Sequence, residues 1–147
     1  MTNRREMLFS AGQSEPNVAS RSLRIIVADD DRDAVMTLMM VLRHEGHEVR
    51  GAHKGADVLQ AMRSFEPDAL IADINMPEMS GYELARRVSA TYLRKPLLIG
   101  VSGVYKKPPD ALIARAVGFD HYLTNPYEPS DVLRLLAPLR HPSAPQS

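Results

Sequence analysis

Three short apolar segments, each followed by polar side chains, constrain the fold of this chain more than any other feature. They are Arg24–Ala28, Ala69–Ala72 and Leu97–Val101. Each is too short for a helix and lacks the alternation of a half-exposed strand, so each is expected to be a strand buried on both faces. Strands of this kind occur in parallel sheets that helices cover on both sides. The pattern therefore predicts an α/β protein.

Acidic and hydroxyl side chains follow these segments directly. Asp29, Asp30 and Asp31 follow the first segment, Asp73 follows the second and Ser102 follows the third. In an open parallel sheet, ligands bind at the carboxyl ends of the strands, where the strand order reverses. We therefore expect these side chains to gather into one site at one edge of the sheet.

Strands and helices are expected to alternate along the chain, five of each. The two further strands are His47 to Ala52, at a sheet edge, and about Asp120 to Leu123. The expected helices run from Asp31 or Asp33 to about Glu45, from about Gly55 to Phe65, from Tyr82 to about Thr91, from Pro108 to Gly118, and from about Pro129 to Leu139. This alternation implies parallel pairing through right-handed crossovers.

Sulfur-containing and imidazole side chains give little sign of a metal site. Met36, Met39 and Met40 lie on the first expected helix, where we expect them to fill the core rather than to act as ligands. His44 and His47 are expected to be solvated, because no cysteine and no third clustered histidine joins them.

The composition limits the functional classes. The 147 residues suit one domain with a sizeable core. The 18 basic and 18 acidic residues balance, so no net field attracts nucleic acid or an anionic membrane. The absence of cysteine excludes disulfides and thiolate sites. No apolar run approaches the ~18 residues of a membrane span, and no secretory signal follows Arg4 and Arg5. We expect a cytoplasmic protein.

The two ends of the chain are expected to lie outside the folded domain. Residues 1–22 are polar and lack a periodicity that would bury them, so they are expected to form a flexible tail. Residues 23–139 are expected to form the domain, and residues 140–147, with Pro142 and Pro145, a second flexible tail. We expect no additional output domain within these 147 residues.

The order and spacing of the segments resemble the receiver domains of two-component response regulators. The likeness covers about residues 23–139. It rests on Asp29-Asp30, on Asp73 followed by Met76-Pro77 and Gly81, on Ser102, and on Tyr122-Leu123-Thr124-Asn125-Pro126. The resemblance implies a flavodoxin-like, doubly wound, five-stranded parallel sheet of order 2-1-3-4-5 with five helices. In that order the first and third strands are neighbours, so their terminal aspartates converge.

The resemblance also implies a phosphoryl-transfer function. Asp73 would be the phosphoacceptor, as a carboxylate can form an acyl phosphate, and the donor would be a phosphohistidine of a histidine kinase or phosphotransfer protein. Mg²⁺ would be the cofactor, because an all-oxygen site with few protein ligands suits this cation. The implied metal ligands are Asp29, Asp30, Asp73 and the backbone carbonyl of Asn75.

Two further residues would report phosphorylation to a protein partner. By resemblance, Ser102 would donate its hydroxyl to a phosphoryl oxygen and Tyr122 would swing inward as the hydroxyl moves. Without the resemblance, a strand-end hydroxyl bonded to its own backbone and a half-buried strand tyrosine explain these residues. The reporting surface would comprise the fourth helix, fifth strand and fifth helix. A monomer or a weak homodimer is expected, with no nucleic-acid or membrane partner.

One residue departs from the family pattern. Asn125 stands where the family usually has a lysine, immediately before Pro126. Asparagine can donate a hydrogen bond, but it is neutral, so a charge-assisted bond worth roughly 1.5 to 3 kcal/mol is missing or weakened. The site should therefore depend more heavily on Mg²⁺. The Asn125-Pro126 bond is also a candidate cis peptide.

Two alternatives to a phosphorylated switch stay open. The chain could be a receiver-like adaptor whose binding does not depend on phosphate. It could also be a Mg²⁺-dependent phosphatase of the haloacid dehalogenase type, with Asp29 and Asp31 as its aspartate pair, although that fold needs a later lysine and further acidic residues. Glycine-rich nucleotide loops are absent from the sequence. We favour a phosphoacceptor that phosphorylates itself and is not a turnover enzyme.

Overall fold

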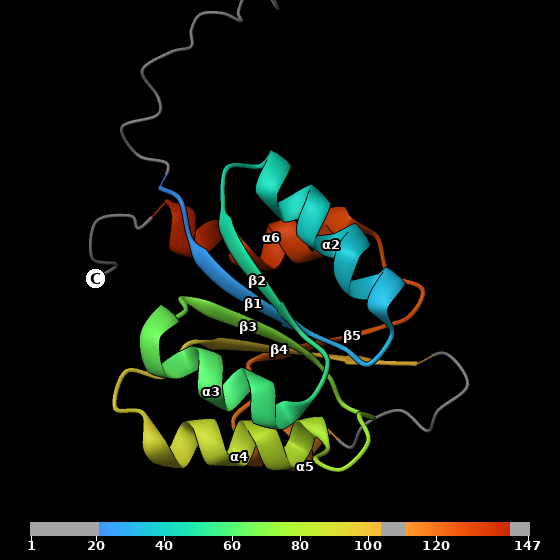
Figure 1. The fold of residues 1–147 in the computed structure, drawn as a ribbon, viewed down its shortest axis with the longest axis vertical. Coiled ribbons are helices and arrows are strands. Elements are labelled where there is room, and N and C mark those ends of the chain that lie inside the picture. The colour runs from blue at the N-terminus through green and yellow to red at the C-terminus, as the bar shows by residue number, and fades with distance from the viewer. Residues whose placement is uncertain (1–20, 104–110, 142–147) are drawn as a thin grey trace, which may run out of the picture.

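The structure is a computed structural model, and it describes residues 21–103 and 111–141. In these ranges five strands alternate with five helices: β1 (Arg24–Ala28), α2 (Arg32–His44), β2 (Glu48–Ala52), α3 (Gly55–Phe65), β3 (Ala69–Asp73), α4 (Gly81–Thr91), β4 (Leu97–Ser102), α5 (Ala111–Val117), β5 (His121–Thr124) and α6 (Pro129–Arg140). The strands form one parallel sheet of order β2-β1-β3-β4-β5 (Figure 1). This confirms the predicted doubly wound fold.

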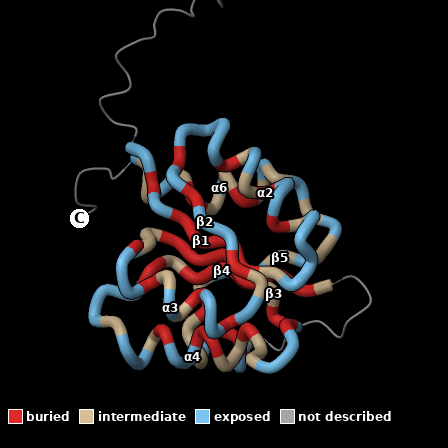
Figure 2. Tube along the Cα trace, in the orientation of Figure 1, coloured by how far each residue is buried: buried red, intermediate tan, exposed pale blue. Residues whose placement is uncertain are grey.

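Helices cover both faces of the sheet. Helices α2 and α6 lie on one face, and α3, α4 and α5 lie on the other (Figure 1). Two apolar clusters result, one on each side of the strands. Figure 2 shows that the buried residues concentrate in the central strands. Because side chains of successive strand residues point to opposite faces, β1 contributes Ile26 to one cluster and Ile25 and Val27 to the other.

Central and edge strands differ in burial as their neighbours require. In β3 every residue except the terminal Asp73 is buried, because strands lie on both sides and helices lie on both faces. The edge strand β2 buries only Val49 and Ala52, and no residue of β5 is fully buried. The edge position expected for the second strand is confirmed.

The start of β1 is joined to the end of α6. The backbone N–H of Arg21 donates to the carbonyl of Arg140 (3.1 Å), and the Arg21 side chain donates to the carbonyl of Leu139 (2.9 Å). The two ends of the described fold therefore lie together, at the edge of the sheet where the parallel strands begin.

Two helices that start beside the carboxyl ends of the strands are capped by polar side chains. The Asp31 carboxylate accepts hydrogen bonds from the N–H groups of Asp33 and Ala34, so Asp31 is the N-cap of α2. The Ser80 hydroxyl accepts from the N–H of Glu83 and caps α4. Of the two expected starts for the first helix, the structure selects Asp31.

Two methionines do not fill the core as expected. Met36 and Met40 are 60% and 65% exposed, while Met39 packs against the core cluster. The buried stripe of α2 runs through Val35, Leu38 and Leu42. Positions 36 and 40 lie about 100° round the helix from positions 35 and 39, which turns their side chains toward solvent.

The expectation that His47 is solvated is wrong. His47 is buried, and its Nδ1 accepts a hydrogen bond from the backbone N–H of Leu23 (3.0 Å). The histidine thereby joins the residue before β1 to the residue before β2. His44 is exposed, as expected.

No helix within residues 21–103 and 111–141 combines the length and the apolar character of a membrane span. The expected helix start at Pro108 lies outside the described residues, as do residues 1–20 and 142–147 of the two expected tails. The inner ends of the expected tails, 1–22 and 140–147, belong instead to the fold, because α6 includes Arg140 and Arg21 is hydrogen-bonded to it.

Candidate functional site

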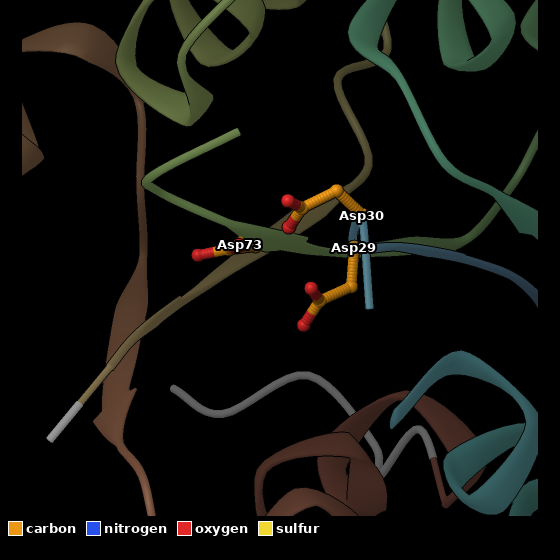
Figure 3. Close-up of side chains that lie close together, drawn as sticks. All are labelled: Asp29, Asp30 and Asp73. Atoms are coloured by element: carbon orange, nitrogen blue, oxygen red, sulfur yellow. The ribbon is translucent and has the colours of Figure 1, made fainter. Parts of the chain in front are cut away.

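Three carboxylates meet at the carboxyl edge of the sheet. Asp29 and Asp30 directly follow β1, and Asp73 ends β3. These strands are neighbours, with Ala28 opposite Ala72, so the next residues along each strand reach the same edge. One oxygen from each of the three carboxylates lies within 4.8 Å of the others (Figure 3). The structure thus brings together three of the residues that the sequence singled out.

Local hydrogen bonds fix two of these carboxylates. The N–H of Asp31 donates to Oδ1 of Asp29 (3.0 Å), and the N–H of Asn75 donates to Oδ1 of Asp73 (3.0 Å). Each bond spans two residues, the geometry by which an aspartate organises its own turn. Asn75 is exposed on the loop after β3, beside the cluster. The Asp31 carboxylate is not part of this cluster and instead caps α2.

Burial and mutual repulsion raise the pKa of two of these carboxyl groups and so disfavour the fully ionised cluster. Burial is the largest cause that raises the pKa of Asp29, to about 7, and the carboxylates of Asp73 and Asp30 raise it further. The pKa of Asp73 is also raised, first by burial and then by the charge of Asp30. No lysine or arginine among the described residues forms an ion pair with the three aspartates. Protonation or a bound cation must therefore relieve the repulsion.

Ser102 ends the neighbouring strand β4. Asp73 lies opposite Val101 in the sheet, so Ser102 is one residue further toward the same edge. Its side chain is buried, and its Oγ has no hydrogen-bond partner within the described structure. A buried hydroxyl without a partner is costly in a folded protein. Ser102 is not bonded to its own backbone, which was the structural explanation for this residue.

Asn125 is attached to Ser102 through the backbone. The N–H of Asn125 donates to the carbonyl of Ser102 (2.8 Å), just past the paired residues Ser102 and Thr124. The Asn125-Pro126 peptide bond is cis, as the sequence suggested. Asn125 is half-buried. Its side chain is neutral, so the position usually held by lysine carries no charge here.

Tyr122 lies on the edge strand β5, opposite Gly100. Its side chain is 39% exposed, and it borders a surface hollow of about 320 Å³ between α5, β5 and α6. The structure therefore places the aromatic residue on the expected surface rather than within the carboxylate cluster.

Two residues beside the cluster were not singled out from the sequence. The Nδ1 of His53 lies 3.1 Å from the carbonyl oxygen of Asp29. Tyr127 is half-buried, and its pKa is raised first by burial and then by the charge of Asp29. Neither residue ends a buried strand, so the pattern that identified the aspartates does not reach them. Tyr127 directly follows the Asn125-Pro126 pair, which was the available signal for it.

A doubly wound sheet with an acidic cluster at its carboxyl edge and a polar residue on the next strand defines a site of the receiver type. The family model of the response regulator receiver domain matches residues 25–137. The chain therefore belongs to the response regulator receiver family, and the resemblance inferred from the sequence is confirmed.

Curated relatives that match this chain include response regulators, which it matches over part of their length. The chain is 34% identical over 124 residues to the response regulator MprA of Mycobacterium ulcerans. This match covers 81% of this chain and 51% of that protein. It is 31% identical over 129 residues to MprA of Mycobacterium bovis, covering 85% and 54%. The chain thus spans about half the length of these relatives. It also matches a 14.6 kDa protein of Leptolyngbya boryana, with 34% identity over 112 residues and coverage of 76% and 86%.

Solved structures agree with this assignment. The signal receiver domain of a response regulator from Bermanella marisrubri has a TM-score of 0.72 and 29% identity, covering 81% of this chain and 98% of that one. A CheY-like receiver domain protein from Methanospirillum hungatei has a TM-score of 0.72 and 26% identity, covering 80% and 92%.

Proposed function

We propose that this domain accepts a phosphoryl group on Asp73 from a phosphohistidine of a histidine kinase or phosphotransfer protein. The observation that carries this proposal is the convergence of Asp73 with Asp29 and Asp30 at the end of two adjacent parallel strands. Asp73 is only half-buried, so a donor can approach it. Members of the receiver family are generally signalling domains, and we propose that this chain is likewise a signalling domain, acting in the cytoplasm, rather than an enzyme with steady turnover of a substrate.

The carboxylate cluster suits a hard divalent cation. The proposed Mg²⁺ ligands are Asp29, Asp30, Asp73 and the backbone carbonyl of Asn75. The donors are all oxygen, the three side chains repel one another, and no described cation offsets them. When bound, Mg²⁺ supplies positive charge against both the carboxylates and the phosphoryl oxygens.

The hydrogen bonds of Asp73 distinguish its two oxygens. Oδ1 accepts the N–H of Asn75, whereas Oδ2 has no backbone donor among the contacts of the described residues. We propose that Oδ2 attacks the phosphorus. The new bond joins Oδ2 to phosphorus, the phosphorus–nitrogen bond of the phosphohistidine breaks, and the bonding electrons leave with the imidazole. In-line transfer of this kind depends on positioning and charge neutralisation.

Ser102 and Tyr122 are proposed to carry the signal onward. The buried Ser102 Oγ has an unused hydrogen-bonding capacity that a phosphoryl oxygen can satisfy. Movement of Ser102 would also act on Asn125 through their backbone hydrogen bond. The proposed output surface comprises α5, β5 and α6, where Leu112 is 81% exposed and Tyr122 is 39% exposed. A downstream protein would bind this surface. The chain itself would act as a monomer or a weak homodimer.

Asn125 distinguishes two versions of this function. Because it supplies no positive charge to a phosphoryl group, coupling between phosphate and the output surface should be weak or altered. The alternative is an adaptor that binds its partner without phosphate. We favour the phosphorylated form, since the acidic cluster, the unpartnered Ser102 hydroxyl and Tyr122 are all in place. Phosphatase chemistry is not favoured, because the Asp31 carboxylate caps α2.

The test is incubation with Mg²⁺ and acetyl phosphate or phosphoramidate, followed by intact mass measurement. The wild-type chain should gain the mass of one phosphoryl group, and Asp73→Asn should gain none. Omission of Mg²⁺ should abolish the adduct. A wild-type chain that forms no adduct at any Mg²⁺ concentration would support the phosphate-independent adaptor instead.

A further inference from the structure

A histidine donates a hydrogen bond to the main chain of the acidic pair. His53, the residue after β2, is half-buried, and its Nδ1 lies 3.1 Å from the carbonyl oxygen of Asp29. A carbonyl oxygen can only accept a hydrogen bond, so the hydrogen of this contact must be on Nδ1. The contact thus selects the ring form that carries a proton on Nδ1.

This bond continues the sheet where the backbone ladder stops. The N–H of Asp29 donates to the carbonyl of Ala52 (3.1 Å), which is the last backbone bond between β1 and β2. Beyond it the chain turns into α3, with Lys54 as the N-cap in place of another strand residue. The His53 ring supplies the donor that a further strand residue would have supplied. Both the N–H and the carbonyl of Asp29 are therefore held.

The held carbonyl belongs to the peptide that joins Asp29 to Asp30. Fixing this peptide limits the directions in which both side chains leave the main chain, because their Cα atoms flank one planar unit. The Asp29 carboxylate is held in addition by the N–H of Asp31. Among the described contacts of Asp29, His53 is the one side chain that restrains its main chain.

We propose that His53 is a positioning residue for divalent-cation binding, which holds the Asp29-Asp30 peptide so that both carboxylates face Asp73. The inference rests on the proposed function, since it concerns the same cluster. His53 touches neither the cation nor the phosphoryl group in this proposal. Its role is to reduce the disorder that the cation must otherwise remove when it binds.

A matched pair of substitutions isolates the hydrogen bond. Asparagine and leucine have nearly the same shape, but only the asparagine amide has an N–H donor on the branch that corresponds to Nδ1 of histidine. His53→Asn should therefore keep the bond to the Asp29 carbonyl, and His53→Leu should lose it. His44→Leu, at an exposed position on α2, serves as a control for removing any imidazole.

Mg²⁺ binding is measured by isothermal calorimetry on the full chain without a phosphoryl donor. The Kd of His53→Leu should rise about fivefold, the change that one ordinary hydrogen bond produces, while His53→Asn and His44→Leu should stay within about twofold of wild type. With acetyl phosphate, the Leu variant should need more Mg²⁺ for half-maximal rate but reach a similar maximal rate at saturation.

Three results would overturn the inference. One is an unchanged Mg²⁺ Kd for His53→Leu, another is a loss in His53→Asn equal to that in His53→Leu, and the third is a wild-type chain that binds no Mg²⁺. A merely structural role would lower the melting temperature of the metal-free variants without changing the Kd. If wild type binds Mg²⁺ as expected but forms no phosphoryl adduct, the proposed phosphoacceptor function fails and the positioning role stands.

Discussion

The Ser102 hydroxyl is buried at the end of β4 without a hydrogen-bond partner, although burial of a polar group normally requires one. Replacing the whole side chain by the methyl group of alanine should remove this desolvation cost. We predict that Ser102→Ala either raises the free energy of unfolding or lowers it by less than about 1 kcal/mol, as measured by urea denaturation. The same variant should take up phosphoryl from acetyl phosphate roughly tenfold more slowly, as expected on losing a donor to a charged group.

Ser102→Thr provides the comparison for this prediction, because it keeps a hydroxyl on the same carbon. It should retain most of the phosphorylation rate. A clear loss of stability in Ser102→Ala would mean that the hydroxyl has a partner that stabilises the fold.

Asn125 offers a test of the missing charge. A lysine at this position would place an ammonium group at the edge where Asp29 and Asp73 repel each other. We predict that Asn125→Lys lowers the pKa of Asp29 below its present value of about 7, because a nearby cation favours the ionised carboxylate. Carbonyl-carbon NMR titration of the aspartates measures the change directly.

The same lysine variant should also reduce the Mg²⁺ concentration needed for half-maximal phosphorylation, because the lysine ammonium group already offsets part of the negative charge of the carboxylates and the phosphoryl group. Asn125→Gln, which lengthens the side chain without adding charge, is the control. Equal behaviour of the lysine and glutamine variants would show that charge at position 125 does not limit the site.

The sequence predicted the residues whose role follows from their place on a strand. Asp29 and Asp30 come directly after one buried strand and Asp73 ends its neighbour, so parallel pairing brings them together. His53 and Met36 depend instead on loop geometry and on helix rotation, which residue type does not determine.

At the scale of secondary-structure elements, the start of α4 is packed directly on the end of β3. A Cβ atom on Gly81 would lie 2.6 Å from the carbonyl oxygen of Asp73 and 2.7 Å from the Cα of Ile74. Both neighbours are backbone, so they cannot move without displacing the acceptor strand. We predict that Gly81→Ala lowers the free energy of unfolding by about 1–3 kcal/mol and slows phosphorylation of Asp73.

Gly46→Ala, in the turn between α2 and β2, is the matched comparison for Gly81→Ala. Gly46 has a φ of +96° and open space where a Cβ would lie, so alanine there costs only the backbone conformation, about 1 kcal/mol. Denaturant unfolding and adduct formation should be measured for both variants. Normal phosphorylation in Gly81→Ala would indicate that the contact between α4 and β3 does not position the site.

Most element boundaries followed from the sequence because apolar runs and caps mark them locally. The helix α3 begins and ends at the expected residues, Gly55 and Phe65. Small differences arise at the functional edge, where β3 includes Asp73, β4 includes Ser102 and α4 begins at Gly81. There the partner strand and the packing of α4 decide the boundary, and both are tertiary effects.

At the scale of the whole molecule, buried His47 links global stability to pH. Its pKa is lowered, first by burial and then by the charge of Arg140, while Glu45 and Asp68 oppose the change. The folded state therefore binds a proton less readily than the unfolded state, whose histidine has a pKa of 6.5. The stability contributed by neutral His47 is complete above pH 6.5 and is lost as the pH falls through and below this value.

We predict that the free energy of unfolding decreases below pH 6.5 in the wild-type chain more steeply than in His47→Asn, whose amide can accept the Leu23 hydrogen bond without titrating. Urea denaturation at a series of pH values measures this difference. Comparison between the two chains removes the opposite contribution of Asp29 and Asp73, whose raised pKa values favour the folded state at lower pH. Identical pH dependence in both chains would contradict the prediction.

The hydrogen bond between Arg21 and Arg140 has a practical consequence for experiments on this domain. Both residues lie where the strands begin, whereas Asp73 lies where they finish. A dye or an affinity handle attached at Ser22 or His141 would thus be anchored at the opposite end of the strands from the acidic cluster. Immobilising the protein through such a handle should leave the acceptor carboxylate open to donors delivered in flow.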